Sequence, residues 1–165
     1  MLMTVETPTR YGVAKPDEMA GLSGLEAMQA MIEGRLPAPP IAKTLGFLIV
    51  EVEEGRAVFE GHPTPDLLNP AGTVHGGWAL TLVDSATACA AHSLLPPGKA
   101  QTTVETKANF TRPILPDGRP IRCEARVVGQ GRQIITAEAH ITNADGKIVA
   151  HGTSTLMVID LTKPR

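Results

Sequence analysis

The residues best suited to chemistry gather in one short stretch, Asn69-Pro-Ala-Gly-Thr-Val-His-Gly-Gly-Trp78, which Asp84 follows six residues later. Asp84 is the only formal charge between Asp66 and Lys99, in a run otherwise typical of a buried helix. A carboxylate buried without a partner is costly, so such a residue is normally paired, protonated or functional. Asp84 could instead face solvent or cap a loop, but we favour a catalytic carboxylate.

Gly76 and Gly77 stand at the predicted start of that helix. The first N–H groups of a helix have no partner within it, and the positive end of the helix dipole adds to their pull on negative charge. Such a pole suits the oxygen of a carbonyl under attack, and glycine lets a substrate approach the backbone closely. The bland alternative is an ordinary Gly-Gly turn, so the pair by itself is weak evidence.

His75 is expected to cap or orient the same helix end, and Asn69 to hold the loop through its side-chain amide or to bind a water. No serine and second histidine stand at a spacing that would build a Ser-His-Asp array, and no acidic and histidine cluster suggests a metal. We therefore predict no metal and no cofactor. Hydrolysis by a carboxylate together with a helix-end oxyanion site is the chemistry that remains.

The helix carrying Asp84 is predicted from Gly76 to Leu94, where Pro96-Pro97-Gly98 must end it. Its many small residues would let a sheet close tightly around it, and a helix apolar nearly all round is a buried helix. Trp78 and Leu82 are interpreted as packing anchors on one stripe.

The remaining patterns are mostly strands. Valine, isoleucine and phenylalanine enrichment and turn residues predict a hairpin over residues 45–53 and 56–62, then four strands near residues 101–111, 121–130, 133–143 and 147–159. Alternation is clearest in the fifth strand, where Ile135, Ala137, Ala139 and Ile141 share one face. Two strands, one helix and four strands predict an α+β fold: an antiparallel sheet of about six strands curled around one long helix.

Upstream, apolar residues at helical spacing predict a short helix from Leu22 to Ile32, which Gly34 ends before a proline-rich linker at residues 37–40. We divide the chain into a flexible arm (1–20), one domain (21–160) and a tail (161–165).

Composition and charge argue against nucleic acid and the membrane as partners. The formal net charge of -2 gives no positive field for nucleic acid, the stretch between Asp66 and Lys99 is too polar for a membrane span, and the chain start lacks a signal-peptide pattern. Cys89 and Cys123 have no spacing suited to zinc, so we expect two reduced thiols in a cytoplasmic protein.

The pattern Asn-x-x-Gly-Thr-x-His-Gly-Gly, with Asp seven residues after the second glycine, resembles the hotdog-fold acyl-CoA thioesterases of the PaaI and thioesterase superfamily member 2 type. The resemblance covers roughly residues 22–158. It implies an acyl-CoA substrate, a homodimer or a homotetramer built as a dimer of dimers, and active sites at the dimer interface.

Carried over by position, the resemblance implies that Asp84 activates water or attacks the thioester and that the Gly76 N–H polarises its carbonyl. Asn69 and His75 would lie on the Gly76 side of the site, contributed by the partner of the subunit that supplies Asp84. Thr103 matches a hydroxyl position where relatives often have serine, and could position water. Gly77 is expected to contact substrate.

Coenzyme A needs cations for its phosphates, and Arg132 in the Gly129–Arg132 turn is the first candidate, ahead of Arg112 and Lys107. Two other functions stay open. A hydratase or dehydratase acting on acyl thioesters would use a histidine and an acid near a long helix, for which His75 and Asp84 are available. A non-catalytic acyl-CoA-binding module is the third possibility, since fold alone does not determine function.

Overall fold

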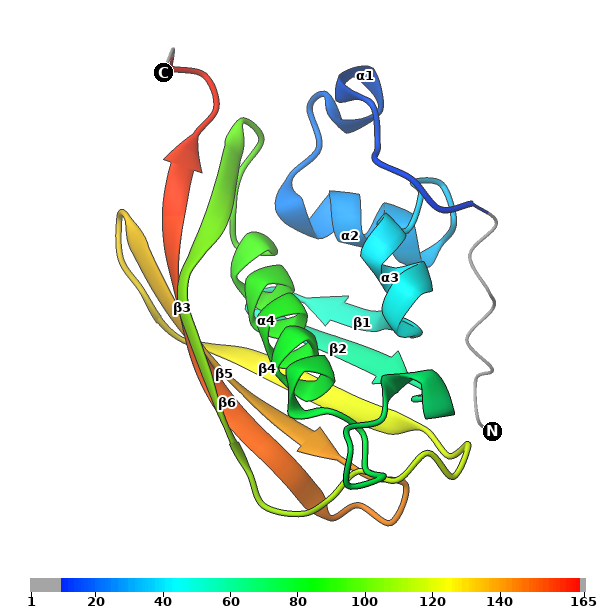
Figure 1. Ribbon diagram of the computed structural model, residues 1–165. Helices are drawn as coiled ribbons and strands as arrows, with labels where there is room; N and C mark the ends of the chain where they lie inside the picture. Colours follow the sequence, from blue (N-terminus) through cyan, green and yellow to red (C-terminus); the bar gives the residue numbers. More distant parts are fainter. Residues whose placement is uncertain (1–9, 164–165) are drawn as a thin grey trace.

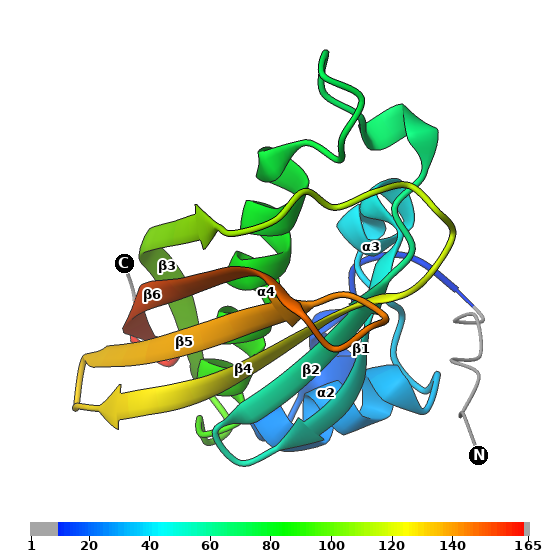
Figure 2. The same ribbon diagram turned by 90° about the horizontal axis from the view of Figure 1, so that it is seen from below.

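The computed structural model describes residues 10–163, in which one antiparallel sheet curls around a single long helix, α4 (Figure 1). The six strands lie in the order β1-β2-β4-β5-β6-β3, so β1 and β3 form the two edges. Their bounds are β1 Phe47–Glu53, β2 Arg56–Gly61, β3 Lys99–Phe110, β4 Ile121–Gln130, β5 Ile134–Thr142 and β6 Ile148–Asp160. Figure 2 shows β2, β4, β5 and β6 crossing side by side along the sheet, with α4 on one face of it.

Helix α4 (Gly76–His92) lies at the centre of the hydrophobic core. Its buried residues pack against the inward faces of β2, β4, β5 and β6, and the predicted alternation along β5 is confirmed, since Ile135, Ala137, Ala139 and Ile141 are all buried. Trp78 is 3% exposed and donates its indole N–H to the Leu45 carbonyl at 2.8 Å, and Leu82 is fully buried, so both are the packing anchors expected. This arrangement is the predicted α+β hotdog fold.

The N-terminal part holds three short helices: α1 (Pro16–Met19), α2 (Gly24–Ile32) and α3 (Pro40–Leu45). Helix α2 confirms the helix expected there, and Ser23 caps it through a reciprocal capping box with Glu26. The linker prediction at residues 37–40 is wrong at its end, because Pro40 begins α3; proline is tolerated at a first helical position, where its missing N–H would be unbonded anyway.

Residues 1–9 of the predicted arm, and 164–165 of the predicted tail, lie outside the described residues. The described part of the arm contacts the domain: the Gly12 N–H donates to the Ala38 carbonyl, and the Arg10 carbonyl accepts from the Ala38 N–H. Arg10 also forms an ion pair with Glu18 at 2.7 Å. Between residues 10 and 163, no helix is long and apolar enough to cross a membrane.

Candidate active site

The loop before α4 is held in shape by Asn69. Its side-chain oxygen accepts from the N–H groups of Ala71 (2.9 Å) and Thr73 (3.3 Å), and its amide nitrogen donates to the Thr73 hydroxyl (2.9 Å). Gly72 completes the turn at φ +80°, a region that favours glycine. Asn69 therefore fixes the loop, one of the two roles that the sequence left open.

His75 caps α4. Its Nδ1 accepts a hydrogen bond from the Gly77 N–H at 2.8 Å, so the Gly77 N–H is not unpaired as we expected from the sequence. Because Nδ1 is an acceptor, the proton of the neutral ring belongs on Nε2, which is then a donor without a partner among residues 10–163, on an exposed side chain. A substrate contact of Gly77 stays a prediction, and it would not use this N–H.

The Gly76 N–H has no hydrogen-bond partner among residues 10–163, as befits the first residue of a helix. The ring of Phe110, at the end of β3, lies against it: a Cβ on Gly76 would stand 3.2 Å from Phe110 Cζ. Because position 76 is glycine, its N–H without a partner stays accessible beside the Phe110 ring. This is the donor expected of an oxyanion site.

Asp84 lies on the middle of α4, half-buried, and faces β3. Its Oδ1 accepts hydrogen bonds from two threonine hydroxyls of that strand, Thr103 at 2.8 Å and Thr106 at 3.0 Å. Within the described chain, no donor is recorded on Oδ2. One oxygen of the carboxylate is therefore anchored by two hydroxyls, and the other has no donor in the described chain.

Thr106 was missed by sequence reasoning, and a β-bulge explains why. Residues three apart on a regular strand face opposite sides, so alternation from Thr103 points Thr106 away from α4. The register with β6 shifts between Thr103 and Glu105, which inserts Val104 as an extra residue and returns Thr106 to the helix side. Bulges of this kind are frequent beside active sites because they re-aim a side chain.

Two other chemistries find little support around Asp84. Burial, and secondarily the negative charge of Asp84, raises the pKa of the Cys89 thiol to about 12, so this cysteine stays protonated and is a poor nucleophile. Over residues 10–163, no group of three or more His, Cys, Asp or Glu side chains could hold a metal ion.

The predicted site residues form two groups within one chain. Asp84 and Thr103 make one, and Asn69, His75 and Gly76 make the other, at the start of α4, where Gly76 stands eight residues before Asp84. At about 1.5 Å of rise per residue the two groups are roughly 12 Å apart along the helix axis. Arg132 belongs to neither group and is exposed in the β4–β5 turn, two residues before Ile134. Ile134 on β5 and Thr102 on β3 both pair with Met157 of β6, so this turn lies at the level of Thr102.

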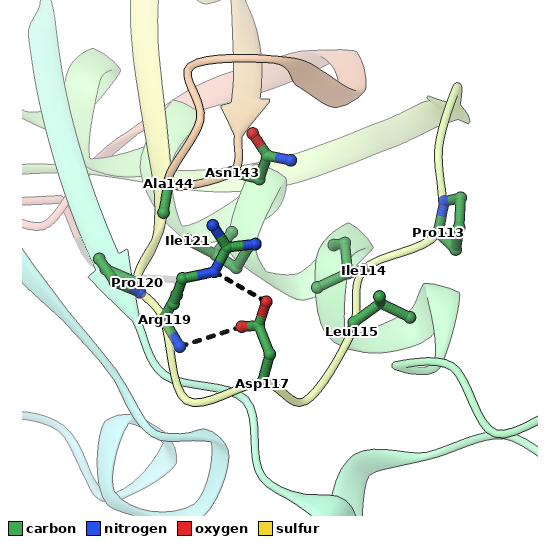
Figure 3. Close-up of a pocket in the computed structure, with 9 residues that line it drawn as sticks. All are labelled: Pro113, Ile114, Leu115, Asp117, Arg119, Pro120, Ile121, Asn143 and Ala144. Atoms are coloured by element: carbon green, nitrogen blue, oxygen red, sulfur yellow. Dashed lines mark hydrogen bonds and ion pairs between the residues drawn. The ribbon is translucent and has the colours of Figure 1, made fainter.

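A hollow of about 60 Å³ lies elsewhere, between the β3–β4 connection and the β5–β6 turn (Figure 3). Its one cation, Arg119, is held by Asp117 and Asp145 at 2.9 Å each. None of the nine lining residues is a predicted site residue. An arginine paired in this way is a poor partner for phosphate, and the hollow adds nothing to the site around Asp84.

Comparison with known proteins agrees with this architecture. A family model for the thioesterase superfamily matches residues 71–150, which include the whole of α4 and run into β6. Acyl-coenzyme A thioesterase PaaI of Escherichia coli K12 is 34% identical over 109 residues, covering 66% of this chain and 75% of the relative. The solved structure of E. coli PaaI has a TM-score of 0.67 at 32% identity, covering 72% of this chain and 83% of that one.

Two further proteins are similar. Acyl-coenzyme A thioesterase 13 of Homo sapiens is 28% identical over 134 residues, covering 79% of this chain and 93% of the relative. A Streptococcus mutans protein solved bound to acetyl-CoA has a TM-score of 0.64 at 25% identity, covering 70% of this chain and 90% of that one.

The sheet wrapped around one helix, with a carboxylate on that helix, defines the class of hotdog-fold thioester hydrolases. The chain belongs to the thioesterase superfamily. Its relatives are named thioesterases, so the chain is assigned to the thioester hydrolases.

Proposed function

We propose that this protein hydrolyses an acyl- or aryl-acyl-CoA thioester to the free acid and CoA. The observation that carries the proposal is the Asp84 carboxylate, half-buried and with Oδ1 held by two hydroxyls. The names of the relatives support the substrate class, since two are acyl-coenzyme A thioesterases and a third was solved with acetyl-CoA. A cytoplasmic location stays a prediction of the sequence.

Two routes use Asp84, and both stay open. As general base, Oδ2 takes a proton from water while the water oxygen attacks the thioester carbon. As nucleophile, Oδ2 attacks that carbon itself and forms a mixed anhydride that water then cleaves. In either route the carbonyl electrons move onto oxygen, return to break the carbon–sulfur bond and release the CoA thiolate, which takes up a proton. In the first route, the Thr103 oxygen could accept a hydrogen bond from the water.

The Gly76 N–H would stabilise the oxygen that gains charge. Such a donor must lie about 3 Å from that oxygen, and the attacking atom about 3 Å from the carbon. When Asp84 Oδ2 itself attacks, a single carbonyl group bridges roughly 7 Å at most, less than the roughly 12 Å that separates Gly76 and Asp84 along the axis of one helix. An attacking water extends this reach by about 3 Å, to roughly 10 Å, which is still shorter. We infer that each site joins Asp84 of one subunit to Gly76 of a second copy.

The free edge of the sheet supports such pairing. Strand β3 has 12 residues, and its outer edge carries no partner strand in the described chain. Long uncovered edges invite another strand, and two apolar side chains on β3 are unusually open, Val104 at 61% and Phe110 at 55% exposed. A homodimer that pairs β3 with its own copy would cover this edge and bring two α4 helices together. A dimer of two such dimers is the larger assembly proposed.

In this arrangement His75 would present Nε2–H, and Asn69 its remaining amide proton, to the substrate held at the Gly76 end of the site. Gly77 would let the substrate pass close to the backbone. Arg132 is our candidate for a CoA phosphate, because it is exposed and no ion pair is recorded for it in the described chain.

The test is release of free thiol from a panel of aryl and medium-chain acyl-CoAs. Asp84→Ala is expected to lose activity by hundreds-fold or more, since removing a principal catalytic group commonly costs about that much. Asp84→Asn keeps the shape without the charge and separates chemistry from folding. Thiol release by Asp84→Ala equal to that of the unchanged protein would sink the proposal. Absorbance loss from an enoyl-CoA without thiol release would favour a hydratase instead.

A further inference from the structure

Behind Asp84 a row of three hydroxyl groups runs into the core. Thr106 on β3 faces Ser154, its direct partner on β6, and their hydroxyl oxygens are 2.9 Å apart. Ser154 is 1% exposed and in turn lies 2.7 Å from the hydroxyl of Thr87, which is fully buried on α4, less than one turn after Asp84. The row thus starts and ends on the same helix and crosses two strands.

The direction of these hydrogen bonds follows from proton counting. An ionised carboxylate accepts only, so Thr106 must spend its single proton on Asp84 Oδ1. The contact between Thr106 and Ser154 then requires Ser154 to donate. Thr87 donates its single proton either to Ser154 at 2.7 Å or to the carbonyl of Val83, four residues earlier on α4, at 2.9 Å. The protons of Thr106 and Ser154 thus both point toward the carboxylate. Chains of hydrogen bonds polarise one another, so each buried hydroxyl strengthens the next.

Thr103 and Thr106 differ in what they can do. In the described chain the Thr103 hydroxyl hydrogen-bonds to Asp84 alone, so its lone pairs are available to a water. Thr106 is held between Asp84 and Ser154, which fixes its rotamer. A group locked in this way suits positioning of the carboxylate rather than contact with substrate.

We propose that Thr106 is a positioning residue that holds Asp84 with Oδ2 toward the thioester, and that Ser154 and Thr87 act through Thr106 by orienting its hydroxyl. This rests on the proposed function of Asp84. The competing view is that the row only satisfies buried hydroxyls in the core, in which case it would contribute to stability and not to turnover.

The experiment compares Thr106→Val, Thr106→Ser, Ser154→Ala and the Thr106→Val/Ser154→Ala double variant, with Thr153→Val as control. Thr153 is an exposed threonine next to Ser154 on β6, with no side-chain hydrogen bond recorded in the described chain. Each variant is assayed for kcat and KM by thiol release, and its thermal midpoint is measured. Unchanged protein and Asp84→Ala are run on the same acyl-CoAs.

Thr106→Val is expected to lower kcat about tenfold, the loss of a hydrogen bond to a charged group. KM should stay within about twofold, because the row does not touch substrate. Thr106→Ser should restore kcat. Ser154→Ala should lower kcat by a few-fold in the unchanged background and by nothing further beside Thr106→Val, since it acts through that residue. Thr153→Val should match the unchanged protein.

An unchanged kcat in Thr106→Val would overturn the inference, and so would kcat losses of the two single variants that add fully in the double variant. If Asp84→Ala still loses hydrolysis in that case, the proposed function stands without the inference. If Thr106→Val does not fold, the decision passes to Ser154→Ala: lowered kcat at constant KM supports the inference, and unchanged kcat overturns it. No thiol release from the unchanged protein would overturn the proposed function and this inference together.

Discussion

At the scale of single residues, His75 has two separable tasks. Its Nδ1 caps α4 by accepting from the Gly77 N–H, and its Nε2, for which the described chain holds no hydrogen bond, is the proposed donor to substrate. A cap stabilises a helix by about 1 kcal/mol, whereas a donor to substrate contributes to catalysis. Most substitutions would remove both tasks at once, but serine is a preferred capping residue and has no imidazole.

We therefore expect His75→Ser to keep the thermal midpoint close to that of the unchanged protein, and His75→Ala to lower stability by about 1 kcal/mol. Both should lose thioesterase activity, because neither supplies the Nε2 donor. Differential scanning calorimetry and thiol release measure the two effects. Full activity in His75→Ser would mean that the histidine serves only as a cap.

At the scale of elements, β1, β2 and β4 are tied together by charged side chains centred on Arg56. Its guanidinium, on a side chain only 12% exposed, contacts Glu51 (2.8 Å), Glu53 (3.3 Å) and Glu124 (3.1 Å). The hydrogen bond from Arg56 is the main cause that lowers the pKa of Glu124, and bonds from Arg122 and then Arg56 lower that of Glu51.

The sign of the pH effect follows. A carboxyl whose pKa is lower in the folded state stabilises the fold above its ordinary pKa of 4.5, and this stabilisation is lost as pH falls through the folded-state value. Arg56→Met should thus cost about 1 kcal/mol at pH 7, discounted for the partly exposed partners, or about 2–4 °C in thermal midpoint. The difference should shrink at pH 3.

Arg35→Met is the matched control, since Arg35 and Glu33 form an ion pair in which both side chains are more than half exposed. It should leave the thermal midpoint unchanged at both pH values. An equal loss at pH 7 and pH 3 in Arg56→Met would instead assign the effect to the packing of the arginine stem.

At the scale of the whole molecule, the proposed sharing of active sites makes a monomer inactive. Two variants that are expected to be inactive, Asp84→Asn and His75→Ala, test this when they are unfolded, mixed and refolded. In a hybrid dimer the first chain supplies an intact His75 and the second an intact Asp84, so one site of two is complete. We expect the mixture to recover roughly a quarter of full activity, because about half of randomly paired dimers are hybrids.

Each variant refolded alone is the control and should stay inactive. Absence of recovery, with hybrids verified by mass spectrometry of the intact assembly, would place Asp84 and His75 of one site in the same chain. A protein that sediments as a monomer at assay concentration while fully active would contradict sharing outright.

The sequence by itself determined most of the architecture. All six strands begin and end within two residues of the ranges expected, because alternation and turn residues are local signals. It also singled out Asp84, because one charge in an apolar helix is conspicuous without coordinates. Helix α3 was not predicted, because it has only six residues, starts at a proline and follows a proline-rich segment, so its sequence carries no clear helical pattern.

Only the tertiary structure decided which groups of the site hydrogen-bond to one another. Whether Thr106 faces α4 depends on the bulge at Val104, and a bulge is a property of the pairing between β3 and β6 that neither strand specifies alone. The loss of the Gly77 N–H to the His75 ring likewise depends on one side-chain rotamer. The residue types were legible in the sequence, but their partners were not, because register and rotamer are set by contacts between segments far apart in the chain.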